Sequence, residues 1–377
     1  LFTKLIAKFT QQTIYKHVGS NLKKSVNQSK FSNKNKYSRL NKRQLKLMKK
    51  IFSLLALLFI INSSFSQIHI NGTVKLDIEK GYVHCEFTLS NLPKKNNYKI
   101  LLNHGMNIKY FKNTKGQLIS YDGYYGGKMK GEALEYNFVD NESKKSDLET
   151  NFKIEYSGAF PVYKDDLNGF DFKGYIAIND KTIRATEQSK WYPVLYDVDN
   201  DKLIDSYTYE ITVITSKSKS VFINGSQPRK GIKTVFESKK PVPLLLFAGE
   251  YDFRNIDENY LINVDVKEDV SNQIFENIDF IKAYYKNLLG INFEDKIYII
   301  NHKAVKGFKE NTSWGFNTYP AFGFSNLDFN DLLTENKKFK ENYYKFFAHE
   351  LAHNYFGNNV NSGNLSWFWL ESTAEYL

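Results

Sequence analysis

The sequence contains very little cysteine and proline. Cys85 is the only cysteine among 377 residues, so the chain can form neither an internal disulfide nor a zinc site built from thiolates. We expect Cys85 to be a buried, inert thiol within a strand. Only 7 prolines and an aromatic content of 16% argue against disorder, and a hydrophobic fraction of 42% is typical of a globular protein. A chain of this length has room for about two domains.

Acidic residues are absent from the first fifty positions. These positions hold 14 Lys and Arg residues, whereas the rest of the chain carries 38 basic and 41 acidic residues. The formal net charge of +11 therefore comes from the N-terminal stretch. The remainder lacks the basic surplus that attracts nucleic acid, so we expect no nucleic-acid partner.

Long hydrophobic runs are missing as well. The apolar run at residues 51–61 has 11 residues, which is too short to cross a bilayer core of about 30 Å. It follows Met48-Lys49-Lys50 and precedes small polar residues, as in a secretory signal peptide. We predict a signal peptide at 48–66, preceded at 1–47 by a mistranslated upstream or disordered basic segment. The protein would then be exported to the periplasm or the extracellular space, with no stable membrane insertion after cleavage. The alternative is a basic N-terminal arm with an uncleaved anchor.

Residues 67–254 alternate between apolar and polar positions in short segments. Turn signals such as Asn71-Gly72 and Asn224-Gly225 separate these segments. The pattern predicts an N-terminal antiparallel β-rich domain, saddle- or sandwich-like. The predicted strands are residues 68–78, 82–89, 98–102, 118–121, 133–138, 152–156, 207–214, 220–223, 233–237 and 241–247.

The hydrophobic period changes after residue 255. Apolar residues recur at helical spacing between Val270 and Leu288, which predicts a helix that begins near Asp269 or Ser271 and ends at Gly290. A buried strand at 296–301, an edge strand within 314–324, a helix at 339–356 capped by Gly357, and the start of a further helix at 370–377 follow. The sequence thus predicts an α+β fold, with a second domain at 255–377 that is incomplete at its C-terminus.

The helix expected at 339–356 carries His349-Glu350-Leu351-Ala352-His353. On a helix, His349 and His353 lie one turn apart and project from the same face, as two zinc ligands must. Glu350 lies beside them, where a carboxylate can take a proton from a zinc-bound water. A catalytic zinc site needs a third protein ligand. Glu371 is our first choice, with Glu375 as a second-shell partner or fallback ligand.

The motif and its surroundings resemble the gluzincin zinc metallopeptidases of the aminopeptidase N family. His349-Glu350-Leu351-Ala352-His353 and the following Tyr355-Phe356-Gly357-Asn358 are similar to that family's H-E-L-A-H-x-W-F-G-N. Trp369-Leu370-Glu371 resembles the W-L-N-E that follows, although the intervening segment is one residue shorter. The resemblance implies one Zn²⁺ per chain, held by His349, His353 and Glu371, with Glu350 as general base. It also implies a truncated thermolysin-like catalytic domain that hydrolyses peptides, in the manner of an aminopeptidase.

Substrate recognition departs from the family's pattern. We expect the substrate backbone to add to an edge strand at Ala321, Phe322, Gly323 and Phe324. The family's G-x-M-E-N glutamate, which holds a free amino terminus, has no counterpart within residues 314–320. The nearest acid is Glu310, which we interpret as a solvated loop charge. The alternatives are therefore an endopeptidase or other hydrolase, and a zinc-binding receptor or scaffold without activity. The sequence does not predict an oligomeric state.

Overall fold

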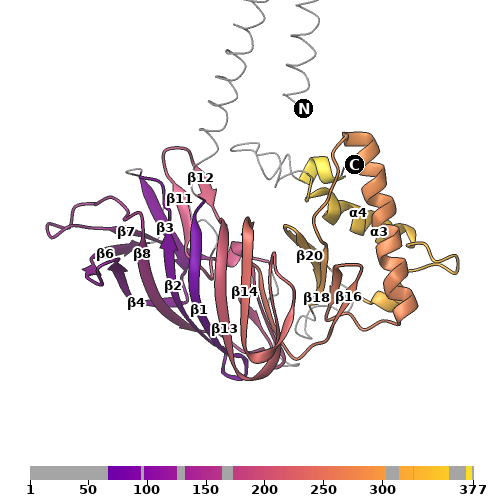
Figure 1. Ribbon diagram of the computed structural model, residues 1–377, viewed down its shortest axis with the longest axis horizontal. Helices are drawn as coiled ribbons and strands as arrows, with labels where there is room; N and C mark the ends of the chain where they lie inside the picture. The colour runs from indigo at the N-terminus through magenta and orange to yellow at the C-terminus, as the bar shows by residue number, and fades with distance from the viewer. Residues whose placement is uncertain are drawn as a thin grey trace, which may run out of the picture. The chain divides into compact units, whose positions relative to one another are not determined.

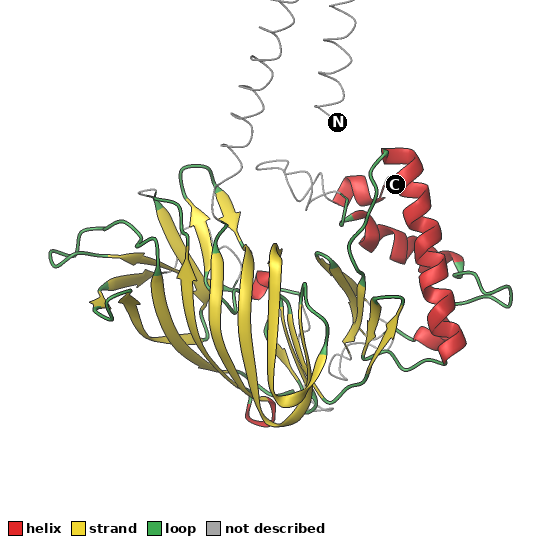
Figure 2. Cartoon of the chain, in the orientation of Figure 1, coloured by secondary structure: helices red, strands yellow, loops and turns green. Residues whose placement is uncertain are grey.

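Strands are the predominant regular structure of the described chain. The computed structural model describes residues 67–94, 97–124, 132–163, 173–302, 314–325, 327–355 and 371–375. Figure 1 shows a strongly curved sheet from the first part of the chain, and the long helices belong to the last part (Figure 2). The predicted upstream segment, the predicted signal peptide, Glu310 and Gly357 lie outside the described residues.

The largest sheet has ten strands. Its order is β5-β4-β8-β2-β1-β13-β15-β10-β9, with β14 also paired to β13. Every pair is antiparallel except β1 with β13, which run parallel. The strands are β1 (His69–Asp77), β2 (Tyr82–Ser90), β4 (Met106–Asn113), β5 (Leu118–Ile119), β8 (Phe152–Ala159), β9 (Ala177–Ile178), β10 (Thr182–Ala185), β13 (Ser206–Ile223), β14 (Arg229–Pro243) and β15 (Leu246–Gly249).

A five-stranded antiparallel sheet packs against the ten-stranded one. Its order is β12-β11-β3-β7-β6. Phe138 of β7 meets Phe111 of β4 and Phe152 of β8 edge to face, with ring centroids 5.1 and 5.3 Å apart. These fully buried rings join the two sheets into the β-rich sandwich that the alternating pattern predicted. The strands are β3 (Tyr98–Asn103), β6 (Tyr121–Tyr124), β7 (Ala133–Phe138), β11 (Val194–Asp197) and β12 (Lys202–Ile204).

The sequence located most strands but misjudged several of their limits. Residues 118–121, predicted as one strand, belong to β5 and β6, which lie in different sheets. The segments predicted at 207–214 and 220–223 are one continuous strand, β13, with a register shift between Ile214 and Lys219. The run at 241–247 is divided between the end of β14 and the start of β15. The prediction omitted β4, whose bulge between Ile108 and Tyr110 interrupts the apolar alternation.

The last part of the chain forms a third sheet with two helices. The sheet order is β16-β17-β18-β20-β19, with β17, β18 and β20 parallel. The long helix begins at Glu268 and ends before Gly290, which has φ +67°, so its predicted limits are confirmed. Residues 371–375 are helical, as expected. The elements are β16 (Phe253–Ile256), β17 (Asn259–Ile262), α3 (Glu268–Leu289), β18 (Tyr298–His302), β19 (Trp314–Thr318), β20 (Ala321–Ser325) and α4 (Glu341–Ala352).

An apolar cluster joins the third sheet to the ten-stranded sheet. Phe222 and Phe247 of β13 and β15 belong to the same buried cluster as Tyr298 and Phe316 of the third sheet. Nearby, the Asn224 side chain donates a 2.9 Å hydrogen bond to the carbonyl of Thr318. Residues 66–377 accordingly form one compact unit. The predicted boundary at 254/255 falls inside β16 rather than in a linker.

The edge of the third sheet is not where the sequence placed it. The predicted docking strand, residues 321–324, lies in β20, which pairs with β18 on one side and β19 on the other. Ala321, Phe322 and Phe324 are also fully buried, and a Cβ at Gly323 would stand 2.3 Å from the Phe316 ring. Among the described strands, β19 and not β20 therefore lies at this edge of the sheet, and β16 lies at the other. Among the described residues, no helix has the length and apolar character needed to span a bilayer.

Candidate metal centre

Packing of aromatic rings holds the motif helix α4 in place. Phe347 is fully buried and stacks on Phe339 at 4.6 Å between centroids, and it lies equally close to Phe324 of β20. The Tyr285 hydroxyl of α3 donates to the carbonyl of Ala348 at 2.8 Å. Burial of the Phe347 face leaves the neighbouring face, with His349 and His353, turned toward a cavity. The helix is shorter than predicted and ends at Ala352, with His353 at its C-cap in a helical conformation.

Three potential ligand atoms converge at this face. His349 Nε2 and His353 Nε2 lie 3.2 Å apart. Glu371 Oε2 lies 3.4 Å from the first and 3.8 Å from the second. Thus the structure brings together the two motif histidines and the carboxylate eighteen residues beyond the second one.

The spacing of these atoms fits a zinc ion. Ligands at about 2.0–2.2 Å from a tetrahedral zinc are separated from one another by about 3.3–3.6 Å. The observed separations of 3.2 to 3.8 Å lie close to that range. Burial, the nearby His349 and the charge of Lys173 lower the pKa of His353 to about 3, so its ring is neutral and its nitrogen is available to a metal.

Glu375 occupies a different position from Glu371. Its Oε2 atom lies 3.3 Å from Nδ1 of His349, the ring nitrogen opposite the one that faces Glu371. A carboxylate on the far nitrogen of a ligating histidine fixes the ring's tautomer and orientation. The geometry thus corresponds to the second-shell alternative for Glu375 rather than to the fallback ligand.

Glu350 is buried beside the three donor atoms. Only 5% of the residue is exposed. Burial raises the pKa of its carboxyl to about 8, the Lys173 charge acts against this increase, and the Glu371 charge adds to it. Oε1 faces β19, where a Cβ added to Gly315 would stand 2.0 Å away. The absence of a side chain at Gly315 therefore makes room for the Glu350 carboxylate.

The side chain of Asn317 in β19 caps the C-terminal end of α4. The last four helix carbonyls need partners outside the regular helical pattern. Three of them accept from the backbone N–H groups of residues 353–355. The fourth, at Glu350, accepts from Asn317 Nδ2 at 3.0 Å, and the same amide donates to Asn354 Oδ1 at 2.8 Å. Asn317 therefore ties the edge strand to the segment that carries Glu350 and His353.

The cavity at this site has a volume of about 400 Å³. Its walls come from the β-rich part of the chain and from the part that forms the third sheet and its helices. Glu350 and the three ligand candidates line it together with β19. The opposite wall comes from the β-rich part and contributes Lys173, Glu187 and Asp205. Burial raises the pKa of Asp205, and Ser206 Oγ donates to its carboxylate at 3.1 Å.

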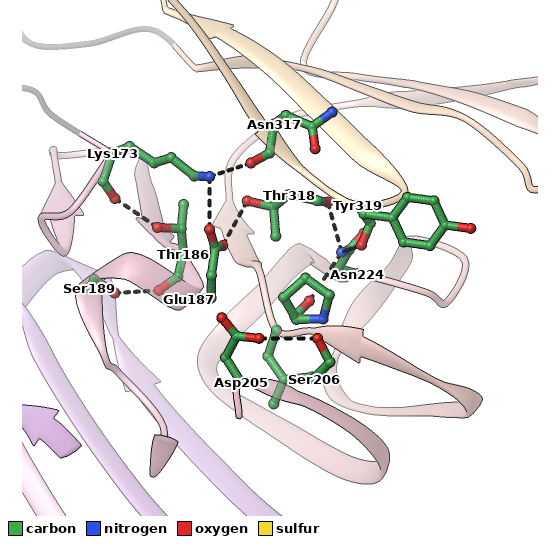
Figure 3. A network of polar contacts seen from close by, with 12 residues as sticks. Lys173, Thr186, Glu187, Ser189, Asp205, Ser206, Asn224, Asn317, Thr318 and Tyr319 are labelled. Atoms are coloured by element: carbon green, nitrogen blue, oxygen red, sulfur yellow. Dashed lines mark hydrogen bonds and ion pairs between the residues drawn. The ribbon is translucent and has the colours of Figure 1, made fainter. Parts of the chain in front are cut away.

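Lys173 and Glu187 form an ion pair that reaches across to β19 (Figure 3). Lys173 Nζ lies 2.8 Å from Glu187 Oε1 and also donates to the carbonyl of Asn317. Glu187 Oε2 accepts from Thr318 Oγ1 at 2.8 Å. The Thr186 hydroxyl donates to the Lys173 carbonyl at 2.7 Å, which fixes the backbone that presents the ammonium.

Sequence reasoning missed the residues from the β-rich wall and the part played by Gly315 and Asn317. Lys173 and Glu187 reach the cavity only through packing of segments more than 120 residues away in sequence, as the contacts Lys173–Asn317 and Glu187–Thr318 show. No local pattern marks them. The glycine within the aromatic Trp314–Phe316 run was the one available signal, because it indicates a close approach to the strand.

Comparison with known proteins gives a likeness of fold. No protein-family model matches the chain, and no curated protein sequence matches it. Native yeast LTA4 hydrolase superposes with a TM-score of 0.50 and 13% identity, over 78% of this chain and 44% of that one. A second native structure of leukotriene A4 hydrolase from Saccharomyces cerevisiae gives 0.49 and 13%, over 77% and 44%. The yeast enzyme in complex with bestatin gives 0.47 and 12%, over 78% and 44%. This chain spans less than half the length of these hydrolases.

Proposed function

We propose that this protein is a zinc-dependent peptidase of the gluzincin type, with Glu350 as its general base. The observation that carries the proposal is the convergence of His349, His353 and Glu371 at tetrahedral ligand spacing. The fold likeness to yeast LTA4 hydrolase supports it, since that protein is named as a hydrolase. The motif resemblance to the aminopeptidase N family supplies the substrate class, a peptide.

The catalytic roles follow from the positions of the side chains. Zinc held by the three ligands supplies a Lewis acid and a water of lowered pKa. In its ionised form, Glu350 accepts a proton at its carboxylate and passes it to the nitrogen of the leaving amine. Burial keeps this carboxylate away from bulk water. Glu375 Oε2 lies 3.3 Å from His349 Nδ1, where a carboxylate can orient the ring that presents Nε2.

The edge strand β19 provides the main-chain contacts for a peptide. It lies beside Glu350 and pairs with β20 on one side only within the described residues. An extended peptide that adds to its other side would be recognised through backbone hydrogen bonds, with little demand on side chains. We assign to β19 the role expected from the sequence for residues 321–324.

Substitution of Glu350 tests the proposal. Glu350→Gln keeps the size of the side chain and removes the base, so we expect bound zinc to be retained and peptide hydrolysis to fall by at least about a hundredfold. The readouts are zinc content by mass spectrometry and cleavage of a mixture of short peptides. Glu276→Gln, at an exposed position of α3, is the matched control. Zinc binding without hydrolysis in the unsubstituted protein would favour the receptor or scaffold alternative.

We also propose that the protein is exported. The support is the positive, apolar and small-residue order of residues 48–66. Expression of the full chain with N-terminal sequencing of the secreted product checks this proposal, with Gln67 expected near the mature terminus. Retention of residues 1–47 in the product would contradict it.

A further inference from the structure

The charges of the cavity divide into two groups. His349, His353, Glu371 and Glu350 belong to the proposed zinc site. The remaining charged residues are Lys173, Glu187 and Asp205 from the β-rich wall. Of these, Lys173 is the cation.

The ammonium of Lys173 is held in a fixed place. Both side chains of its pair with Glu187 are largely buried, with 16% and 11% exposed. An ammonium has three N–H donors, and two of them point to Glu187 Oε1 and the Asn317 carbonyl. No partner among the described residues is found for the third N–H, and Lys173 lines the cavity.

The Glu187 carboxylate is less able than Lys173 to bind a ligand. Lys173 binds one of its carboxylate oxygens, and Thr318 donates to the other. A free ammonium of a substrate would have to compete with Lys173 for this carboxylate and would meet the lysine's positive charge. Lys173 thus occupies the Glu187 carboxylate from within the chain.

Lys173 also limits how far a peptide can extend along β19. Its bond to the Asn317 carbonyl uses a backbone acceptor of the edge strand. Gly315, beside Glu350, and Asn317 are two residues apart, which corresponds to about 7 Å along a strand. A peptide with its scissile bond at Glu350 has room for about two residues before it reaches the ammonium.

We propose that Lys173 is a specificity-determining residue that binds a carboxylate at the end of a short peptide, about two residues from the scissile bond, and disfavours a free ammonium there. This inference rests on the proposed peptidase function. The inference separates the aminopeptidase from the other hydrolases that the sequence left open, by the end group of the substrate. An aminopeptidase requires a free amine, whereas the Lys173 subsite favours a blocked or acidic end.

Peptides that differ only at their ends test the inference. With the zinc-loaded full chain, kcat/KM is measured for one internal sequence with a free, acetylated or succinylated amino terminus, each with a free or amidated carboxyl terminus. We expect one carboxylate-bearing peptide to be cleaved about tenfold faster than its neutral partner. The two series show which end carries the preferred carboxylate. Equal cleavage of the carboxylate-bearing peptides and their neutral partners in both series would overturn the inference.

Two variants connect the preference to Lys173. Lys173→Arg keeps the charge and should keep the preference. Lys173→Met with Glu187→Gln removes both charges together, so that no buried carboxylate is left unpaired, and should abolish the difference in kcat/KM between carboxylate-bearing and neutral peptides, whatever its effect on the absolute rates. A preference that survives in this double variant contradicts the role of Lys173.

Binding provides a second readout. Calorimetry on zinc-loaded Glu350→Gln protein with the preferred carboxylate-bearing peptide, uncleaved, should give about tenfold tighter binding than with its neutral partner. That difference should disappear when Lys173→Met and Glu187→Gln are added, and its persistence would contradict the inference. Failure of the peptidase proposal looks different, because no peptide of either series would then be cleaved by the unsubstituted protein.

Discussion

Gly315 of the edge strand lies directly against the carboxylate of Glu350. A Cβ at position 315 would stand 2.0 Å from Glu350 Oε1 and 2.6 Å from Glu350 Cδ. These distances are too short for non-bonded atoms, so one of the two groups would have to move. Because Glu350 itself is buried and its backbone carbonyl is held by Asn317, the carboxylate has little freedom to move aside. The position of the Glu350 carboxylate thus depends on the absence of a side chain at Gly315 of β19.

The first prediction concerns Gly315→Ala. The added methyl group should push the Glu350 carboxylate away from the proposed reaction centre, and a displacement of about 1 Å is enough to lower kcat/KM about a hundredfold. Zinc content should stay unchanged, because the ligands lie on α4 and the 371–375 helix. Steady-state kinetics and metal analysis on the same preparation check both statements.

Gly231→Ala serves as its control. There the nearest atom to a new Cβ is the Thr234 methyl group at 3.3 Å, and the position is not part of the cavity wall. Activity equal to that of the unsubstituted protein is expected for this variant. If Gly315→Ala also retained full activity, the assignment of Glu350 as base would lose its geometric support.

The second prediction separates Glu371 from Glu375. Glu371→Ala should remove a direct ligand and abolish stoichiometric zinc binding. Glu375→Gln removes only the charge behind His349 Nδ1, so zinc should still bind, with an affinity about tenfold to a hundredfold lower. Competition with a chromogenic chelator measures both affinities. The reverse order of the two effects would make Glu375 the ligand.

The pair of motif histidines could be predicted from the sequence because helical spacing fixes their relative positions. His349 and His353 are four residues apart, so any helix through them turns both rings to one face, and the ends of α3 were marked by its apolar period and Gly290. The alternation of apolar residues likewise indicated the β-rich part. The edge strand was misplaced, since alternation shows that residues 314–324 are extended but not which of two hairpin strands lies outside.

The cavity wall opposite the proposed zinc site could not be predicted. Lys173, Glu187 and Asp205 stand in sequence contexts that resemble ordinary surface segments. They face the site because the apolar cluster around Phe222 and Phe247 holds the third sheet against the β-rich part. Such tertiary placement depends on the whole fold and leaves no short-range signature.

The third prediction concerns stability in acid. Lys109 donates to Glu155 Oε1 at 2.8 Å, and this hydrogen bond holds the pKa of the Glu155 carboxyl below its usual value. A carboxyl whose pKa is lower in the folded state stabilises the protein above its unfolded pKa of about 4.3 and loses that contribution as the pH falls through the folded pKa. Glu155→Gln should therefore lower the free energy of unfolding at pH 7 and make it depend less on pH below about 4.3.

Urea unfolding of the zinc-free protein between pH 3 and pH 7 measures this dependence and avoids effects of metal release. Glu276→Gln, with no ion pair described for it, should follow the unsubstituted protein at every pH. A Glu155→Gln curve parallel to that of the unsubstituted protein would show that the Lys109 contact contributes nothing to stability.

The fourth prediction concerns the amide that joins β19 to the end of α4. Asn317→Leu keeps a similar volume but removes the hydrogen bonds that the Asn317 amide donates to the Glu350 carbonyl and to Asn354 Oδ1. Loss of hydrogen bonds to buried acceptors costs about 1–3 kcal/mol, so the free energy of unfolding should fall by that amount. The exposed Asn107→Leu is the matched control and should change the free energy of unfolding by less than about 0.5 kcal/mol.

Since the same contact positions Glu350 beside Gly315, kcat should fall together with stability in Asn317→Leu, whereas zinc affinity should change little. Unchanged unfolding in urea would mean that water replaces the amide at the helix end.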